Sequence, residues 1–159
     1  MTIAVGQTLP DVKLTLATES GPKPVQSGEY FKGKRVVLFS VPGAFTPTCS
    51  AKHLPGYVEN AAAILAKGVD EIVCTAVNDP FVMGAWGKAS GSPEISMLAD
   101  GNGDFAKALG LTLDLSGAGI GQRGQRFALV AKDGVVEQLF VEAAGEFKVS
   151  AAEHVLASL

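Results

Sequence analysis

Cys49 is the residue of this chain best placed to perform covalent chemistry. It ends the segment 41–49 (VPGAFTPTC), which follows the apolar run Arg35–Ser40 and precedes a long Ala-rich stretch of helical character. At the start of a helix, unpaired N–H groups and the macrodipole both favour negative charge. A cysteine at such a junction is expected to be largely a thiolate at neutral pH, and the thiolate is the nucleophilic form.

Other residues of the same segment could assist this cysteine. Thr46 lies three residues before Cys49, so its hydroxyl could reach the sulfur or a substrate held there. Pro42 and Pro47 stiffen the loop and remove two backbone donors. Two plainer interpretations stay open: a lone cysteine is often a small buried hydrophobe, and a turn threonine often bonds to nearby backbone.

The spacing Pro42-x-x-x-Thr46-x-x-Cys49 resembles the active-site motif of the peroxiredoxins. The longer segment 39–50 (FSVPGAFTPTCS) is similar to the branch that contains the atypical type II and type 5 peroxiredoxins. Three further segments resemble the same branch: 52–57 (KHLPGY), 77–83 (VNDPFVM) and 124–127 (GQRF). The resemblance extends in order over residues 3 to 158, nearly the whole chain.

This resemblance implies a thiol-dependent peroxidase that reduces hydrogen peroxide and alkyl hydroperoxides without a metal, haem or flavin cofactor. Cys49 would attack the peroxide, become a sulfenic acid, and be regenerated by glutathione and glutaredoxin or by thioredoxin. Thr46 would hold the peroxide through its hydroxyl, and the backbone N–H groups of Gly43 and Cys49 would bind oxygen. Pro42 would shield the thiolate from water.

Arg126 is the expected source of positive charge. An arginine stays charged and offers several donors, so it can favour the Cys49 thiolate and stabilise charge that grows on the peroxide oxygens. In the resembled family an arginine at this place completes the site. Arg123 has a similar claim, either as a supporting partner or only as a loop charge. Arg126 is favoured because it adjoins Phe127 at the start of an expected strand.

Cys74 permits two interpretations. It lies in the apolar run 72–77 (IVCTAV), where a buried structural cysteine is the ordinary assignment. Alternatively it is a resolving thiol that attacks the sulfenic acid on Cys49 and forms an intramolecular disulfide. The spacing of the two cysteines matches the type II branch. The resolving cysteine that type 5 enzymes carry near the C-terminal helix is missing from 146–150 (EFKVS).

Other function classes remain as alternatives. His53 lies four residues after Cys49, and a Cys–His pair suggests nucleophilic transfer chemistry, although Pro55 disturbs this turn. A thiol–disulfide oxidoreductase is weakened by the lack of a Cys-x-x-Cys pair. A redox-sensing or holdase-like binding protein would keep its main activity after Cys49→Ser. Two histidines and two scattered cysteines show no metal-ligand spacing.

Length, composition and charge are those of one domain spanning residues 1–159. The chain is 47% hydrophobic with a net charge of −3, which suits a sizeable core and gives no basic footprint for nucleic acid or anionic membranes. No apolar run approaches the roughly 20 residues of a membrane span, and the first ten residues lack a charged-then-apolar leader. Two cysteines do not suggest a secreted disulfide scaffold, so we expect a reduced, cytoplasmic protein.

Apolar periodicity and turn residues predict alternating strands and helices. Strands are expected at 12–16, 36–39, 72–77 and 95–98, and as a hairpin at 126–131 and 135–141. Helices are expected at 57–67 ending at Gly68, at 80–89 capped by Asp79, at 104–109, and at 150–158 with a Ser150/Glu153 capping box. Residues 18–33 are expected to be a loop with at most short strand content, and residues 113–124 a long loop.

This order predicts an α/β fold with a mixed central sheet and helices on both faces, since parallel βαβ units precede an antiparallel hairpin and a helix. The resemblance likewise implies a thioredoxin-like fold. It also implies a homodimer built on loops near the active site, with Phe45, Phe81 and Trp86 as contributors.

Overall fold

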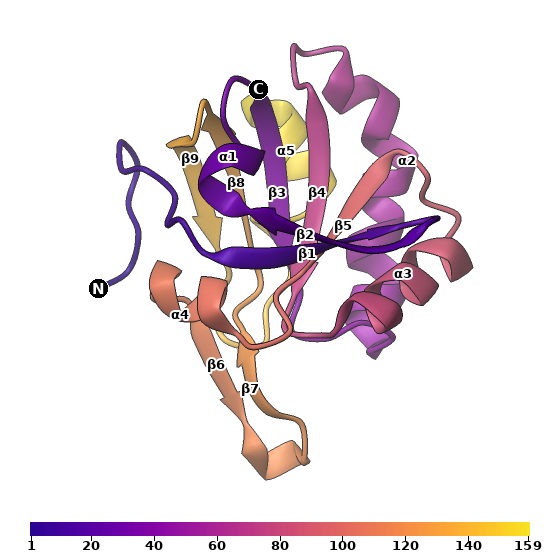
Figure 1. The fold of residues 1–159 in the computed structure, drawn as a ribbon. Helices are drawn as coiled ribbons and strands as arrows, with labels where there is room; N and C mark the ends of the chain where they lie inside the picture. Colours follow the sequence, from indigo (N-terminus) through magenta and orange to yellow (C-terminus); the bar gives the residue numbers. More distant parts are fainter.

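The computed structural model describes residues 1–159 and is built on a seven-stranded sheet in the order β2-β1-β5-β4-β3-β8-β9 (Figure 1). Three central strands run parallel, namely β3 (Arg35–Ser40), β4 (Glu71–Ala76) and β5 (Ile95–Ala99). The outer strands pair antiparallel, and they are β1 (Lys13–Thr18), β2 (Gly21–Gln26), β8 (Phe127–Lys132) and β9 (Val135–Val141). The sheet is therefore mixed, as predicted.

Helices cover both faces of this sheet (Figure 1). One face packs against α2 (Leu54–Leu65), α3 (Pro80–Ala89) and α5 (Ala152–Ser158). The other face packs against α1 (Ser27–Tyr30), α4 (Asp104–Leu109) and the N-terminal arm. The apolar run of β3 follows from this arrangement, because a strand covered on both sides buries every side chain. The predicted α/β architecture is confirmed, and no helix has both the length and the apolar character that a membrane crossing requires.

The helix after Cys49 begins earlier than the expected residue 57. The chain is helical from Pro47, passes through a π-helical turn at Cys49–His53 and continues as α2 from Leu54. Pro55 has no N–H to donate within this helix, which accounts for a wider turn just before it. The disturbance expected from Pro55 is thus present as a π turn. At its other end α2 stops at Leu65, short of Gly68.

Two segments expected to be loops, the first with at most short strand content, contain more regular structure than that. Residues 18–33 include β2 and α1, and residues 113–124 belong to a separate hairpin of β6 (Thr112–Leu115) and β7 (Gly121–Gly124), joined by a 3-10 turn at Ser116–Ala118. Both segments are rich in glycine or proline, which predict loops and mask the apolar periodicity of a strand. The two prolines of β2 are tolerated because β2 is an edge strand that pairs on one side only.

One helix cap is as expected and one is not. The Asp79 carboxylate accepts a hydrogen bond from the Val82 N–H (2.8 Å) and caps α3. At α5 the N-cap position belongs to Ala151, and the expected Ser150/Glu153 capping box is absent. Instead the Ser150 hydroxyl donates to the buried Glu142 carboxylate (2.6 Å). A charged acceptor brought in by tertiary structure competes successfully with a local cap.

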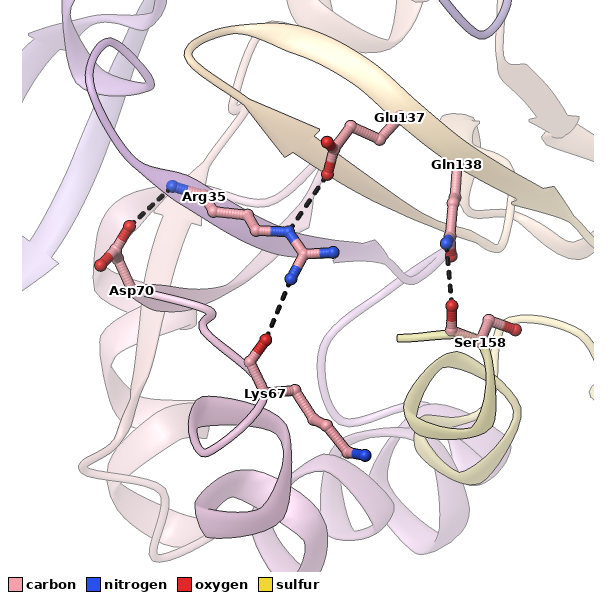
Figure 2. Close-up of polar contacts among 6 residues, drawn as sticks. All are labelled: Arg35, Lys67, Asp70, Glu137, Gln138 and Ser158. Atoms are coloured by element: carbon pink, nitrogen blue, oxygen red, sulfur yellow. Dashed lines mark hydrogen bonds and ion pairs between the residues drawn. The ribbon is translucent and has the colours of Figure 1, made fainter.

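Arg35 ties three parts of the molecule together at the start of β3 (Figure 2). Its Nε donates to Glu137 on β9 (3.1 Å), and its Nη1 donates to the Lys67 carbonyl after α2 (3.0 Å). In the same view the Gln138 side chain donates to the Ser158 carbonyl (2.9 Å). These contacts hold β9 and α5 at the end of β3 remote from the Cys49 loop.

Candidate active site

Cys49 is buried, with no exposed surface, near the start of the helix that follows β3. The backbone N–H groups of Gly43 and Cys49 donate to no other atom of the protein. Both groups are therefore unpaired within the protein, and Cys49 itself lies where a helix start favours negative charge.

Arg126 contacts the sulfur directly. Its Nη2 donates to Cys49 Sγ (3.1 Å), and its Nη1 donates to His53 Nδ1 (2.8 Å). The contact follows from sheet register: β8 lies antiparallel to β3 with Phe127 opposite Ser40, so the residue before β8 lies beside the loop after β3. A guanidinium at this distance can donate a hydrogen bond to the sulfur and to negative charge that develops beside it.

His53 does not form the Cys–His pair that its spacing suggested. Its Nε2 lies 3.1 Å from the Ser150 carbonyl oxygen, which can only accept, so the proton is on Nε2 and Nδ1 accepts from Arg126. Burial lowers the pKa of His53 to about 3, and the charge of Arg126 adds to that effect. The ring is neutral at physiological pH and serves as a partner of Arg126, because the π turn directs it there.

Thr46 and Pro42 both belong to the loop that precedes Cys49. The Thr46 hydroxyl donates to the Gly43 carbonyl (2.7 Å), which is the turn contact considered as its plainer role. With the hydrogen so directed, the hydroxyl offers its lone pairs to any incoming O–H group. Pro42 lines a groove together with Arg126.

Arg123 packs near Gly43 but makes no hydrogen bond to the Cys49 sulfur. Its Nη1 donates to the Val77 carbonyl (3.0 Å) and its Nε to the Ile120 carbonyl (3.0 Å). It therefore braces the β6–β7 hairpin against the loop after β4. The structure separates the two arginines: Arg126 touches the sulfur and Arg123 binds only main chain.

Cys74 packs in the core. It lies on β4 opposite Phe39 of β3 and belongs to the same buried cluster as Cys49. Both thiols are free. Burial raises the pKa of the Cys74 thiol, and the nearby Cys49 raises it further. In this conformation Cys74 is a poor nucleophile, because only the thiolate attacks.

A groove of about 790 Å³ opens beside Arg126. It lies between β6 and the segment after β9, and its walls include Thr48, Lys52, Leu113, Leu115, Glu142 and Phe147. Sequence reasoning missed the wall residues after β9, and it missed the contact between Ser150 and His53. His53 and Ser150 are 97 positions apart, so no local sequence pattern links them.

Comparison with known proteins agrees with this site. The protein-family model described as Redoxin matches residues 4–156. Peroxiredoxin-2B of Arabidopsis thaliana is 48% identical over 159 residues, covering 99% of this chain and 98% of its own. Hybrid peroxiredoxin hyPrx5 of Haemophilus influenzae is 43% identical and matches 95% of this chain and 64% of its own length.

Solved structures show the same fold. Reduced Prx3 of Vibrio vulnificus, crystallised in complex with hydrogen peroxide, superimposes with a TM-score of 0.95 at 54% identity over 99% of each chain. Peroxiredoxin 5 of Alvinella pompejana gives a TM-score of 0.87 at 36% identity over 98% of this chain and 97% of its own. The chain therefore belongs to the peroxiredoxins, in the branch of the type II and type 5 proteins, and is a thiol peroxidase.

Proposed function

We propose that this peroxidase reduces hydrogen peroxide and small alkyl hydroperoxides through Cys49, with an external thiol as reductant. The observation that carries the proposal is the contact of the Arg126 guanidinium with the buried Cys49 sulfur (3.1 Å). The backbone N–H groups of Gly43 and Cys49, which have no protein partner, support it. The complex of the Vibrio vulnificus protein with hydrogen peroxide supports the choice of substrate.

In the proposed first step the Cys49 thiolate attacks one peroxide oxygen. An S–O bond forms, the O–O bond breaks, and the other oxygen leaves as water or an alcohol after taking up a proton. Negative charge moves from sulfur to the leaving oxygen. Arg126 and the N–H groups of Gly43 and Cys49 surround that charge, and such fixed donors act mainly on the transition state.

Thr46 and Pro42 prepare the substrate and the sulfur. The Thr46 hydroxyl already donates to Gly43, so it accepts the O–H of the bound peroxide and orients the O–O bond. Pro42 limits the access of water, because its ring lines the entrance and brings no N–H of its own.

Regeneration is proposed to come from outside the chain. The thiol of glutathione, assisted by glutaredoxin, or of thioredoxin attacks the sulfenic acid on Cys49, releasing water and forming a mixed disulfide that a second thiol reduces. The raised pKa of Cys74 supports this route over an internal disulfide. The groove beside Arg126 provides the approach, and a thiol reductant suits a reducing compartment such as the cytoplasm.

A homodimer is also proposed. Phe45 and Phe81 are 55% and 72% exposed, and both adjoin the active-site loops. Phe45 has a positive φ of 64°, a conformation that bulky residues rarely adopt. Trp86, the third expected contributor, is excluded because it is only 1% exposed and its indole N–H donates to Ser50 (3.0 Å).

The decisive experiment is intact mass after one equivalent of hydrogen peroxide, for wild type, Cys49→Ser and Cys74→Ser. We expect wild type and Cys74→Ser each to gain oxygen quickly and Cys49→Ser to remain unchanged. Rapid loss of two hydrogens in wild type, with oxygen gained only by Cys74→Ser, would show that Cys74 resolves internally. Slow or absent oxidation of Cys49 would remove the assignment of Cys49 as the attacking residue.

A further inference from the structure

Glu142 is a buried carboxylate without a cationic partner. It directly follows β9, is 8% exposed, and takes part in no ion pair. Its Oε2 accepts three hydrogen bonds: from the Lys148 N–H (2.7 Å), the Ser150 N–H (2.8 Å) and the Ser150 hydroxyl (2.6 Å). Burial by itself would raise the pKa of Glu142, but the hydrogen bonds from Ser150 and the neighbouring amides lower it overall.

Ser150 transmits this contact to the active site. Its N–H and hydroxyl bind Glu142, and its carbonyl oxygen accepts from His53 Nε2 (3.1 Å) and from the Tyr57 hydroxyl (2.8 Å). A continuous series of hydrogen bonds thus runs from Glu142 through Ser150 and His53 to Arg126, and ends at the Cys49 sulfur.

The donor and acceptor of each hydrogen bond determine which nitrogen of His53 carries the proton. A carbonyl can only accept, so Ser150 keeps the His53 proton on Nε2 and leaves the Nδ1 lone pair facing Arg126. If Ser150 moved away, His53 could carry its proton on Nδ1. An N–H would then oppose the guanidinium N–H groups, and Arg126 would turn away from Cys49.

The same segment also contacts the His53 ring and the Arg126 guanidinium directly. Phe147 lies with its ring 5.0 Å from the His53 ring and 5.8 Å from Arg126 Cζ. Glu142 accepts from residues on either side of Val149, so it sets the shape of the segment that carries Phe147 and Ser150.

We propose that Glu142 and Ser150 are positioning residues of the peroxidase site, acting through His53 to hold Arg126 on the Cys49 sulfur. The inference rests on the proposed role of Cys49, and it adds the C-terminal segment to the machinery. Neither residue touches the reacting atoms.

The test compares Glu142→Gln and Ser150→Ala with the control Glu153→Gln, which removes an exposed charge from neighbouring α5. Two rates are measured: peroxide oxidation of Cys49, and alkylation of Cys49 by iodoacetamide over a pH series, read by peptide mass. Glu142→Gln should slow oxidation about tenfold, as for loss of a charge-assisted hydrogen bond. Ser150→Ala should slow it about threefold, since only the hydroxyl contact to Glu142 is lost and the main-chain contacts of Ser150 remain.

The pH dependence of Cys49 alkylation shows whether Glu142 and Ser150 position the site or only stabilise the fold. In Glu142→Gln the pH at which alkylation reaches half its maximum rate should rise, and Ser150→Thr should restore the wild-type profile that Ser150→Ala loses. Glu153→Gln should match wild type in both rates. Lower thermal stability with unchanged rates and an unchanged pH profile would overturn the proposal. If Glu142→Gln does not fold, the two Ser150 variants decide.

A double-mutant cycle tests the route through Arg126. In an Arg126→Gln background, Glu142→Gln should slow oxidation no further; a full additional tenfold loss would overturn the route. If peroxide fails to oxidise the wild type quickly while Glu142→Gln still shifts the alkylation profile, the proposed role of Cys49 fails and the positioning role stands.

Discussion

At the scale of single residues, the site depends on one guanidinium with two partners. Arg126 donates through Nη1 to His53 and through Nη2 to Cys49. Only a planar, forked donor can make both contacts at once. His53 therefore helps to orient the Arg126 guanidinium toward the Cys49 sulfur, although its own ring makes no hydrogen bond to the sulfur.

Arg126→Lys should slow peroxide oxidation of Cys49 by about 100-fold, because an ammonium keeps the charge and loses the fork. Stopped-flow fluorescence of Trp86, which is bonded to Ser50 beside the cysteine, can follow the reaction. Arg35→Lys, at the far end of β3, is the matched control and should react at the wild-type rate. Equal rates for Arg126→Lys and wild type would contradict the role of the fork.

His53 should make the fold sensitive to acid. Its pKa is about 3 in the folded protein against 6.5 as the reference. As the pH falls below 6.5, His53 becomes protonated in the unfolded chain but stays neutral in the folded protein. The free energy of unfolding therefore decreases. Between pH 7 and 4.5 this residue should remove about 2–3 kcal/mol from the free energy of unfolding.

Urea unfolding of wild type and His53→Gln at both pH values tests this effect. The glutamine variant should lose less stability on acidification by about that amount. Because other groups titrate in both proteins, the difference between the two losses isolates His53. Equal losses would show that burial does not keep the ring neutral.

At the scale of elements, strand register and one irregular turn assemble the site. The antiparallel pairing of β8 with β3 places Arg126 beside the Cys49 loop. The π turn Cys49–His53 then directs His53 toward that arginine. The structural contacts lie at the other end of the sheet, where Arg35 joins β3, β9 and the end of α2.

Arg35→Ala should lower the free energy of unfolding by about 1–2 kcal/mol, from loss of a hydrogen bond to a carbonyl and a partly exposed ion pair. The rate of Cys49 oxidation should not change, since the contacts are remote from the site. Urea titration measures the first quantity and stopped-flow fluorescence the second. A variant as stable as wild type, or one with slower oxidation, would contradict this division of roles.

At the scale of the whole molecule, two large aromatic side chains are exposed, one in the loop before Cys49 and one at the start of α3. Phe81 is 72% exposed on the first turn of α3, and Phe45 is 55% exposed in the loop before Cys49. Large exposed aromatic side chains are typical of interface centres. The proposed homodimer would cover them.

Sedimentation at micromolar concentration should show a dimer for the reduced wild type and a monomer for Phe81→Glu, because a buried unpaired carboxylate opposes association. Val5→Glu is the control, since Val5 is 60% exposed on the N-terminal arm. It should remain a dimer. A monomeric wild type would end the dimer proposal.

The sequence by itself determined the nucleophile loop, the alternation of strands and helices, and the α/β class. These depend on local information: apolar runs, turn residues and the Asp79 cap act over a few positions. Local patterns failed where proline and glycine concealed β2 and the β6–β7 hairpin. They also failed at Ser150, where the distant Glu142 replaced a local cap.

Tertiary structure alone decided which side chains meet. His53 and Arg126 are 73 positions apart, and His53 and Ser150 are 97 apart. Their contacts arise from strand pairing and from packing of the C-terminal segment, which no short-range pattern encodes. The same packing buries Cys74 and raises its pKa, and it separates Arg126 from Arg123. Residue types and spacing identify the chemistry, but burial and register assign the partners.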